Sequence, residues 1–226
     1  MILKLRRVLT AGLRSRQFSG CGSVKVMETT EVERKLVPAK PSALEPMQEP
    51  AEGFDKCLQR AAGILVNLSE RNMMKVLHVH CGGRLGYYLG QSSVFDITGV
   101  SSILKDVEEA KSQRQYKNVS LVDGHFRSLS EDFRSSAFQA VVCLHPPHAL
   151  TCSAPSIQEL LRLVTDDGFA LVGAREEAWE ADGLMEEVNA AEAGAGGLMG
   201  HSASLLSMQI IDTGDASYMM ALIRKK

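Results

Sequence analysis

Residues 76–90 read VLHVHCGGRLGYYLG, and the interpretation of the whole chain starts from them. An apolar run leads directly into two consecutive glycines, Gly82 and Gly83. A buried strand that ends in a glycine turn is typical of α/β domains that bind a nucleotide, because glycine lets the backbone approach the ligand closely. Three polar side chains interrupt the pattern: His78, His80 and Arg84. The stretch therefore predicts a strand, a tight turn and a helix around a ligand site of unusual chemistry.

Short apolar runs alternate with helical segments along the rest of the chain. We predict strands at 75–79, 94–100, 118–122, 138–144, 169–173, 205–211 and 216–223. We predict helices at 54–72, 101–115, 156–164 and 176–193, the last of them interrupted by Gly183, and turns at 165–168 and 212–215. Alternation of strands with helices implies parallel pairing, and nearly all-apolar strands imply helices on both faces. The expected fold is an α/β three-layer sandwich with a mostly parallel seven-stranded sheet and a C-terminal antiparallel hairpin.

The N-terminal region differs in composition from the body. Residues 1–27 carry six basic residues and no acidic one, a composition typical of a mitochondrial transit peptide. Residues 28–53 hold four of the seven prolines and read as a disordered linker. The expected folded domain spans 54–226, and the expected location is the mitochondrion, most simply its matrix. The alternative for residues 1–27 is a disordered basic tail.

Charge and cysteine content limit the function further. The chain has a net charge of -2, so the part after residue 27 carries -8 once the six N-terminal basic residues are set aside. Such an acidic body disfavours nucleic acid as a partner, because phosphate contacts need a basic face. No apolar run is long enough for a membrane span. The five cysteines show no CxxC spacing, which favours reduced thiols over disulfides.

Five segments in order resemble motifs of the class I S-adenosylmethionine-dependent methyltransferases. They are VLHVHCGGRLG, ITGVSS, NVSLVDGH, FQAVVCLHPPHAL and LLRLVTDDGFALVGARE. The resemblance covers residues 54–226 and implies a Rossmann-like methyltransferase fold with S-adenosyl-L-methionine as the cofactor. It implies that the cofactor turn contains His78, His80, Gly82, Gly83 and Arg84. At the neighbouring strand ends, it implies cofactor contacts from Ser101, Leu144 and His145, and from either Asp123 or His125 on the adenine side, depending on a one-residue shift.

The chain departs from this family at the polar positions of the motifs. His78 stands where the family has its first acid, His80 where it has the first glycine and Arg84 where it has a later glycine. Ser101 replaces the acid that binds ribose, and Gln139 replaces the acid of the fourth strand. Arg84 either fills the cofactor site or points to solvent. Ser101 either binds ribose or, with Ser102, caps the following helix.

The histidines raise the question of a metal. His78, His80, His125, His145 and His148 are expected at the strand ends where α/β domains bind ligands, together with Cys81. Imidazoles and a thiol can bind zinc, but no close-spaced HExxH or CxxC motif accompanies them, so we assign no metal site from the sequence. His145-Pro146-Pro147-His148 resembles the (N/D)PP(Y/F) element of amino-group methyltransferases, although a rigid turn explains it more simply.

Two functions remain open, and no catalytic residue is assigned. The first is a methyltransferase with a diverged and weakened cofactor site, for an unknown substrate. The second is a non-catalytic binding or assembly module built on the same fold, since a fold does not determine an activity.

Overall fold

We describe the computed structural model of the chain over residues 52–69, 72–82, 84–90, 94–123, 129–145, 155–194, 200–214 and 216–226. All of these residues belong to one unit, Met47–Lys226. The predicted transit peptide and nearly all of the predicted linker lie outside the described residues.

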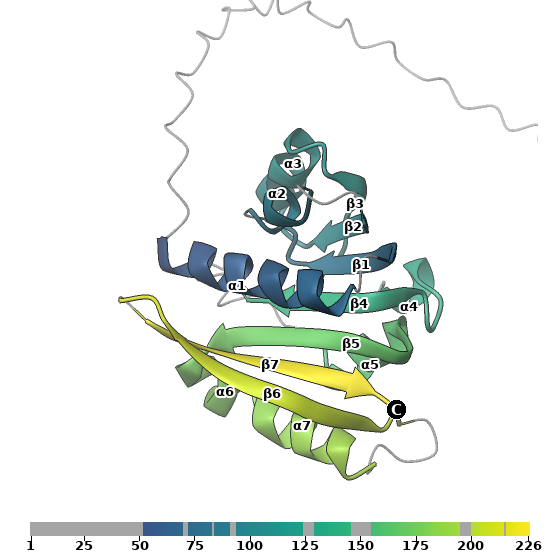
Figure 1. The fold of residues 1–226 in the computed structure, drawn as a ribbon, viewed down its shortest axis with the longest axis vertical. Helices are drawn as coiled ribbons and strands as arrows, with labels where there is room; N and C mark the ends of the chain where they lie inside the picture. The colour runs from purple at the N-terminus through teal and green to yellow at the C-terminus, as the bar shows by residue number, and fades with distance from the viewer. Residues whose placement is uncertain are drawn as a thin grey trace, which may run out of the picture. The chain divides into compact units, whose positions relative to one another are not determined.

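A seven-stranded sheet forms the centre of this unit (Figure 1). Its strands are β1 (Met74–Val79), β2 (Phe95–Ser101), β3 (Tyr116–Leu121), β4 (Phe138–Leu144), β5 (Val164–Arg175), β6 (Ala203–Asp212) and β7 (Ser217–Lys225). Their spatial order is β3-β2-β1-β4-β5-β7-β6. The first five strands pair in parallel, whereas β7 runs antiparallel to both β5 and β6. The expected mostly parallel sheet with a closing hairpin is confirmed.

Helices cover both faces of the sheet (Figure 1). They are α1 (Glu52–Leu68), α2 (Leu85–Gly90), α3 (Leu104–Ser112), α4 (Leu129–Asp132), α5 (Ile157–Leu163), α6 (Glu176–Ala181) and α7 (Leu184–Glu192). Side chains of α1, α2 and α3 contribute to one buried cluster, and those of α5, α6 and α7 to the other. Alternate residues of β1 point into the two clusters, with Val76 in the first and Leu77 in the second. Within the described residues, no helix is both long and apolar enough to span a bilayer.

Two local signals in the sequence act as expected. Ser156 precedes α5, and its hydroxyl oxygen accepts a hydrogen bond from the amide of Glu159 at 3.2 Å, which satisfies a donor at the helix start. Gly183 separates α6 from α7 with φ of 64°, a left-handed conformation that glycine adopts without steric cost.

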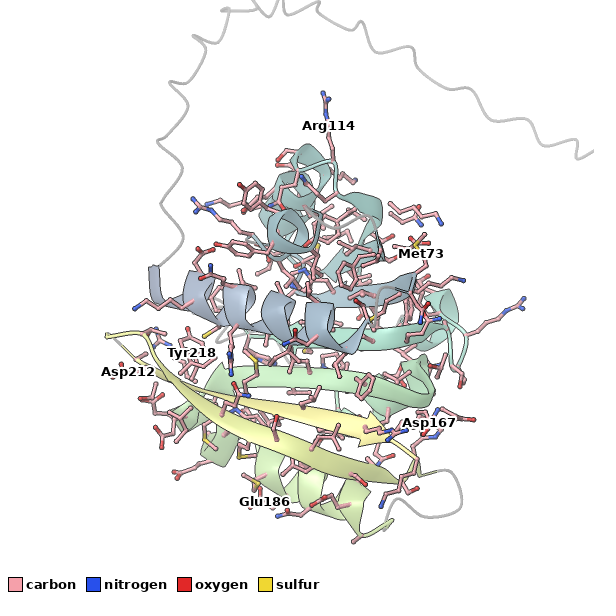
Figure 2. The ribbon with its side chains drawn as sticks, viewed as in Figure 1. Met73, Arg114, Asp167, Glu186, Asp212 and Tyr218 are labelled. Atoms are coloured by element: carbon pink, nitrogen blue, oxygen red, sulfur yellow. The ribbon has the colours of Figure 1, made fainter. Side chains whose placement is uncertain are left out.

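The predicted turn at 165–168 is wrong. The structure runs β5 continuously from Val164 to Arg175, and the irregularity is absorbed as a register shift against β4. Asp167, labelled in Figure 2, takes φ of 63° within this segment. An aspartate tolerates the left-handed region better than most residues, so the TDDG signal produces an irregular strand and not a chain reversal.

Candidate functional site

The candidate site lies where β1 meets β4 at the carboxyl ends of the parallel strands. β1 pairs with β2 on one side and with β4 on the other, so the order of the strands reverses between β1 and β4. In open α/β sheets, ligands bind at such a reversal, beyond the carboxyl ends of the strands. The residue pair that closes this part of the sheet is Val79 on β1 and Cys143 on β4.

His78 is buried beneath this site and forms a hydrogen bond with a tyrosine. Its Nδ1 lies 2.7 Å from the Tyr116 hydroxyl, which is also 3.4 Å from the carbonyl oxygen of Cys81. Burial lowers the pKa of His78 to about 3 and raises the pKa of Tyr116 well above its usual value. Both rings are therefore neutral at physiological pH, and His78 supplies no charge in place of the acid found in the family.

Two glycines near the predicted turn provide space for the same tyrosine. A Cβ on Gly86 would come to 2.3 Å from Cε2 of Tyr116, and a Cβ on Gly99 to 3.0 Å from its Cδ1. Both distances are shorter than van der Waals contact between carbon atoms. Gly86 and Gly99 therefore serve the packing of an internal ring in the structure described here.

A carboxylate occupies the space beside Gly82. A Cβ on Gly82 would come to 2.8 Å from Cγ of Asp106, a buried residue in the first turn of α3. The hydroxyl of Ser101, at the end of β2, donates to Oδ2 of Asp106 at 3.0 Å. The Ser101 oxygen also accepts a hydrogen bond from the amide of Ile103 at 3.1 Å. The N-cap residue of α3 is Ile103, which makes no side-chain capping bond, so neither Ser101 nor Ser102 is the N-cap. An acid thus lies at the end of β2 after all, although it comes from the next helix.

Arg84 points away from the strand ends and toward α1. Its Nη1 lies 3.9 Å from Oδ2 of Asp55, and its side chain is 56% exposed. The hydroxyl of Tyr88 donates to the same carboxylate oxygen at 2.5 Å. Of the two alternatives raised by the sequence, the structure shows the outward one, in which Arg84 contributes to the contact between α1 and α2.

The other predicted residues are spread around the strand ends. Leu144 is buried at the end of β4, and its Cδ2 would lie 2.6 Å from a Cβ on Gly173. Asp123 follows β3 and is exposed. Gln139 uses its side-chain oxygen to accept from the backbone amide of Lys75 at 2.8 Å, a structural task that explains an amide at the family's acid position. The predictions for Gly83, His125 and His148 lie outside the described residues.

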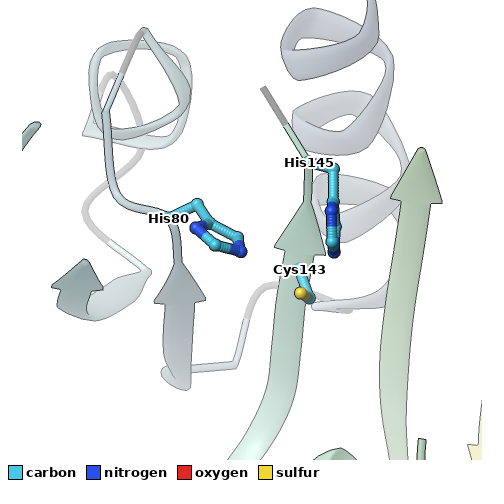
Figure 3. A group of neighbouring side chains, drawn as sticks. All are labelled: His80, Cys143 and His145. Atoms are coloured by element: carbon cyan, nitrogen blue, oxygen red, sulfur yellow. The ribbon is translucent and has the colours of Figure 1, made fainter. Parts of the chain in front are cut away.

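His80, Cys143 and His145 form a cluster at the junction of β1 and β4 (Figure 3). The imidazole of His80 is directed from the end of β1 toward the end of β4, where the other two residues lie. One nitrogen of each imidazole and the Cys143 sulfur all lie within 4.8 Å of one another. The two imidazole rings meet edge to face, with centroids 5.1 Å apart. His80 takes φ of 59° and is 1% exposed, so a histidine occupies the left-handed conformation that a glycine would adopt without strain.

Burial governs the protonation of this cluster. Burial raises the pKa of the Cys143 thiol to about 12. It also lowers the pKa of His145 below its ordinary value, although the charge of Asp182 acts in the opposite direction. The Cys143 thiol and the His145 imidazole are therefore both uncharged at neutral pH.

Two residues of the site, Asp106 and Cys143, were not predicted from the sequence. Asp106 follows the ribose-acid position by five residues and reads as one of several charges on a polar helix. Cys143 lies in a strand that is apolar apart from Gln139, where a cysteine is expected as an ordinary buried residue. The two-residue alternation of β4 was the one signal available, because it places Cys143 and His145 on the same side of the strand.

No family model matches the chain, and no curated protein matches it in sequence. Solved structures do match it in fold. The magnesium protoporphyrin IX methyltransferase of Synechocystis, solved with bound S-adenosylmethionine, is 16% identical, with 77% of this chain and 80% of that chain covered at a TM-score of 0.56.

Two further structures resemble the chain to a similar degree. The [4+2]-cyclase SpnF is 18% identical, with 74% of this chain and 81% of that chain covered at a TM-score of 0.51. The N-methyltransferase NodS of Bradyrhizobium japonicum is 11% identical, with 76% of this chain and 98% of that chain covered at a TM-score of 0.50. The strand order, the closing hairpin and these likenesses together identify the fold: the chain has the Rossmann-like fold of the class I S-adenosylmethionine-dependent methyltransferases.

Proposed function

We propose that the chain is a mitochondrial S-adenosylmethionine-dependent methyltransferase whose cofactor site has diverged and binds weakly. The observation that carries the proposal is the Ser101–Asp106 pair beside Gly82. A carboxylate at the end of the second strand is the group that accepts hydrogen bonds from the hydroxyls of a ribose in this class of fold. Asp106 offers a carboxylate from α3, next to Ser101, which occupies the motif position where the family has its acid.

Methyl transfer from a sulfonium demands little acid–base chemistry from the protein. The cofactor carries the activated methyl group, so the chain has to hold it, orient the acceptor and exclude water. Replacement of the motif acids is therefore compatible with activity, provided that the nucleoside is held. For that reason, binding is the property to measure first.

Calorimetry of the full chain with S-adenosylmethionine and S-adenosylhomocysteine tests the proposal. We expect binding in the micromolar range, because a site that keeps one charge-assisted contact retains part of the usual affinity. Asp106→Asn removes the charge and keeps the shape, and should weaken binding by roughly 10- to 100-fold, the value of a hydrogen bond to a charged group. Asp132→Asn, at an exposed position of α4 at the far ends of the strands, is the matched control and should bind as the unaltered chain does. Absence of binding at millimolar ligand would overturn the proposal.

A second function, a non-catalytic binding module, is favoured by a different observation. The space beside Gly82, Gly86 and Gly99 is taken by the side chains of Asp106, Tyr116 and Cys81, so these glycines accommodate the chain's own residues. A nucleotide site whose glycines are filled from within has less room for a ligand. SpnF, named as a cyclase, illustrates that this fold carries more than one activity. Absence of cofactor binding in the calorimetry above would support this second function.

A further inference from the structure

The cluster of His80, Cys143 and His145 combines two imidazoles and one thiol at the reversal of strand order. We propose that these three residues bind a transition-metal ion of the zinc class. The site goes beyond the proposed function, since the metal needs no nucleotide in order to bind and the three residues do not include Ser101 or Asp106.

The donor set fits a borderline or soft metal ion. Nitrogen of imidazole and sulfur of cysteine are the usual ligands of zinc, whereas Mg²⁺ and Ca²⁺ take oxygen ligands. In a tetrahedral zinc site, bond lengths of about 2.0–2.3 Å place neighbouring donor atoms about 3.3–3.6 Å apart. The three donor atoms here lie within 4.8 Å of one another. Rotations of the side chains that move the donors inward by about 1 Å would therefore complete the geometry.

Backbone hydrogen bonds already fix the positions of Cys143 and His145. Cys143 is held by strand pairing with Val79 on β1 and Val172 on β5. The amide of His145 donates to the carbonyl oxygen of Gly173 at 2.8 Å, which fixes the end of β4. One ligand therefore lies in a paired strand and the other two directly follow strand ends, positions that are held more rigidly than those in a long loop.

Two features indicate that the cluster has a task other than packing. His80 keeps a left-handed backbone conformation at φ of 59°, which residues with a side chain adopt uncommonly. Nε2 of His145 is buried, and among the described residues it has no hydrogen-bond partner. A buried polar atom without a partner is unfavourable, and coordination to a metal would satisfy it.

The binding step needs no oxidant and no second reactant. The metal ion forms bonds to one nitrogen of each imidazole and to the Cys143 sulfur, whose S–H bond breaks and releases one proton to solvent. Three protein ligands leave one tetrahedral position for a water molecule or an external ligand.

Metal titration of the full chain tests the site. The chain is stripped with a chelator under reducing conditions and titrated by calorimetry with Zn²⁺, with Mg²⁺ as a hard-cation control. Co²⁺ in place of Zn²⁺ gives an optical readout, because a Co²⁺–thiolate bond produces a charge-transfer absorption and four-coordinate Co²⁺ produces strong visible bands. We expect one equivalent of Zn²⁺, no Mg²⁺ and a thiolate band with Co²⁺.

Paired variants separate the cluster from general effects of losing a cysteine or a histidine. Cys143→Ser should weaken Zn²⁺ binding by at least about 100-fold and abolish the thiolate band, since even outer-shell changes weaken metal sites by about 10- to 100-fold. Cys57→Ser is the matched control, because Cys57 and Cys143 are both free and both 1% exposed. His145→Gln is a second cluster variant at a half-buried position, and it should also weaken Zn²⁺ binding by at least about 100-fold. It tests the site even if Cys143→Ser does not fold. His201→Gln, ahead of β6 and at the opposite ends of the parallel strands, is its control.

The outcomes divide clearly. Loss of binding in the two cluster variants and its retention in the two controls would support the site. A missing thiolate band in the unaltered chain, or equal weakening in Cys57→Ser and Cys143→Ser, would overturn it. Because the titration contains no nucleotide, its failure leaves the proposed function standing, and a failure to bind S-adenosylmethionine leaves the metal site standing.

Discussion

Burial of His78 makes the stability of the chain depend on pH in a way that one substitution should remove. The His78 imidazole is 0% exposed, and its pKa in the folded chain is about 3, compared with 6.5 for an exposed histidine. Between these two pH values, the unfolded chain binds a proton at this position that the folded chain does not. Stability contributed by neutral His78 is therefore complete above the unfolded pKa and is lost as the pH falls toward the folded one.

The size of the effect follows from the two pKa values. At about pH 5, the unfolded imidazole is almost fully protonated and the folded one is neutral, which gives a loss of about 2 kcal/mol in unfolding free energy relative to about pH 7.5. Tyr116, whose hydroxyl contacts the ring, stays neutral over this range because burial raises its pKa well above the usual value. His78→Gln keeps a polar group that can bond to Tyr116 but cannot be protonated, so this part of the pH dependence should vanish.

Urea unfolding of both chains at the two pH values provides the measurement. Trp179 is the only tryptophan and is 2% exposed, so its fluorescence reports the loss of the folded core. Other histidines titrate equally in both chains, so the comparison isolates His78. We expect the unaltered chain to lose about 2 kcal/mol more than His78→Gln between the two pH values. Parallel losses in the two chains would refute the reasoning, whatever the variant costs in stability at neutral pH.

Two further predictions concern packing and targeting. Gly86→Ala places a methyl group against the buried ring of Tyr116 and should lower the unfolding free energy by about 1–3 kcal/mol, as overpacking does. Gly63→Ala, in an exposed turn of α1 with no atom within 4 Å of the new Cβ, should instead raise it by about 0.5–1 kcal/mol, and urea unfolding distinguishes the signs. The predicted transit peptide, fused to a fluorescent reporter, should direct it into mitochondria, and a version with its arginines replaced by glutamates should leave it outside. Equal import of the two fusions would contradict the targeting hypothesis.

The strands and the closing hairpin could be predicted because burial dictates their composition. β4, for example, begins and ends at the predicted residues, since every position that faces a helix layer must be apolar. The break at Gly183 could be predicted for a similar reason, because glycine disfavours a continuous helix. The turn at 165–168 could not, since its residues suit a reversal and an irregular strand equally well, and pairing with β4 decides between them.

The site was harder to predict because side-chain direction depends on distant partners. Arg84 belongs to the turn in sequence, but Asp55 on α1 draws its side chain outward. Asp106 lies beyond the motif position, and it reaches the end of β2 only because the first turn of α3 folds back over Ser101. A single sequence contains the residues of such contacts but not their pairing.

The place of β7 in the sheet has a consequence for the order in which the domain is assembled. β7 lies between β5 and β6, yet it follows both of them along the chain. During synthesis, β6 emerges before the strand that connects it to the sheet. Until β7 arrives, β5 presents an open edge that can pair with other chains. While residues 175–217 are being made, a nascent chain therefore exposes a strand edge that a chaperone would protect.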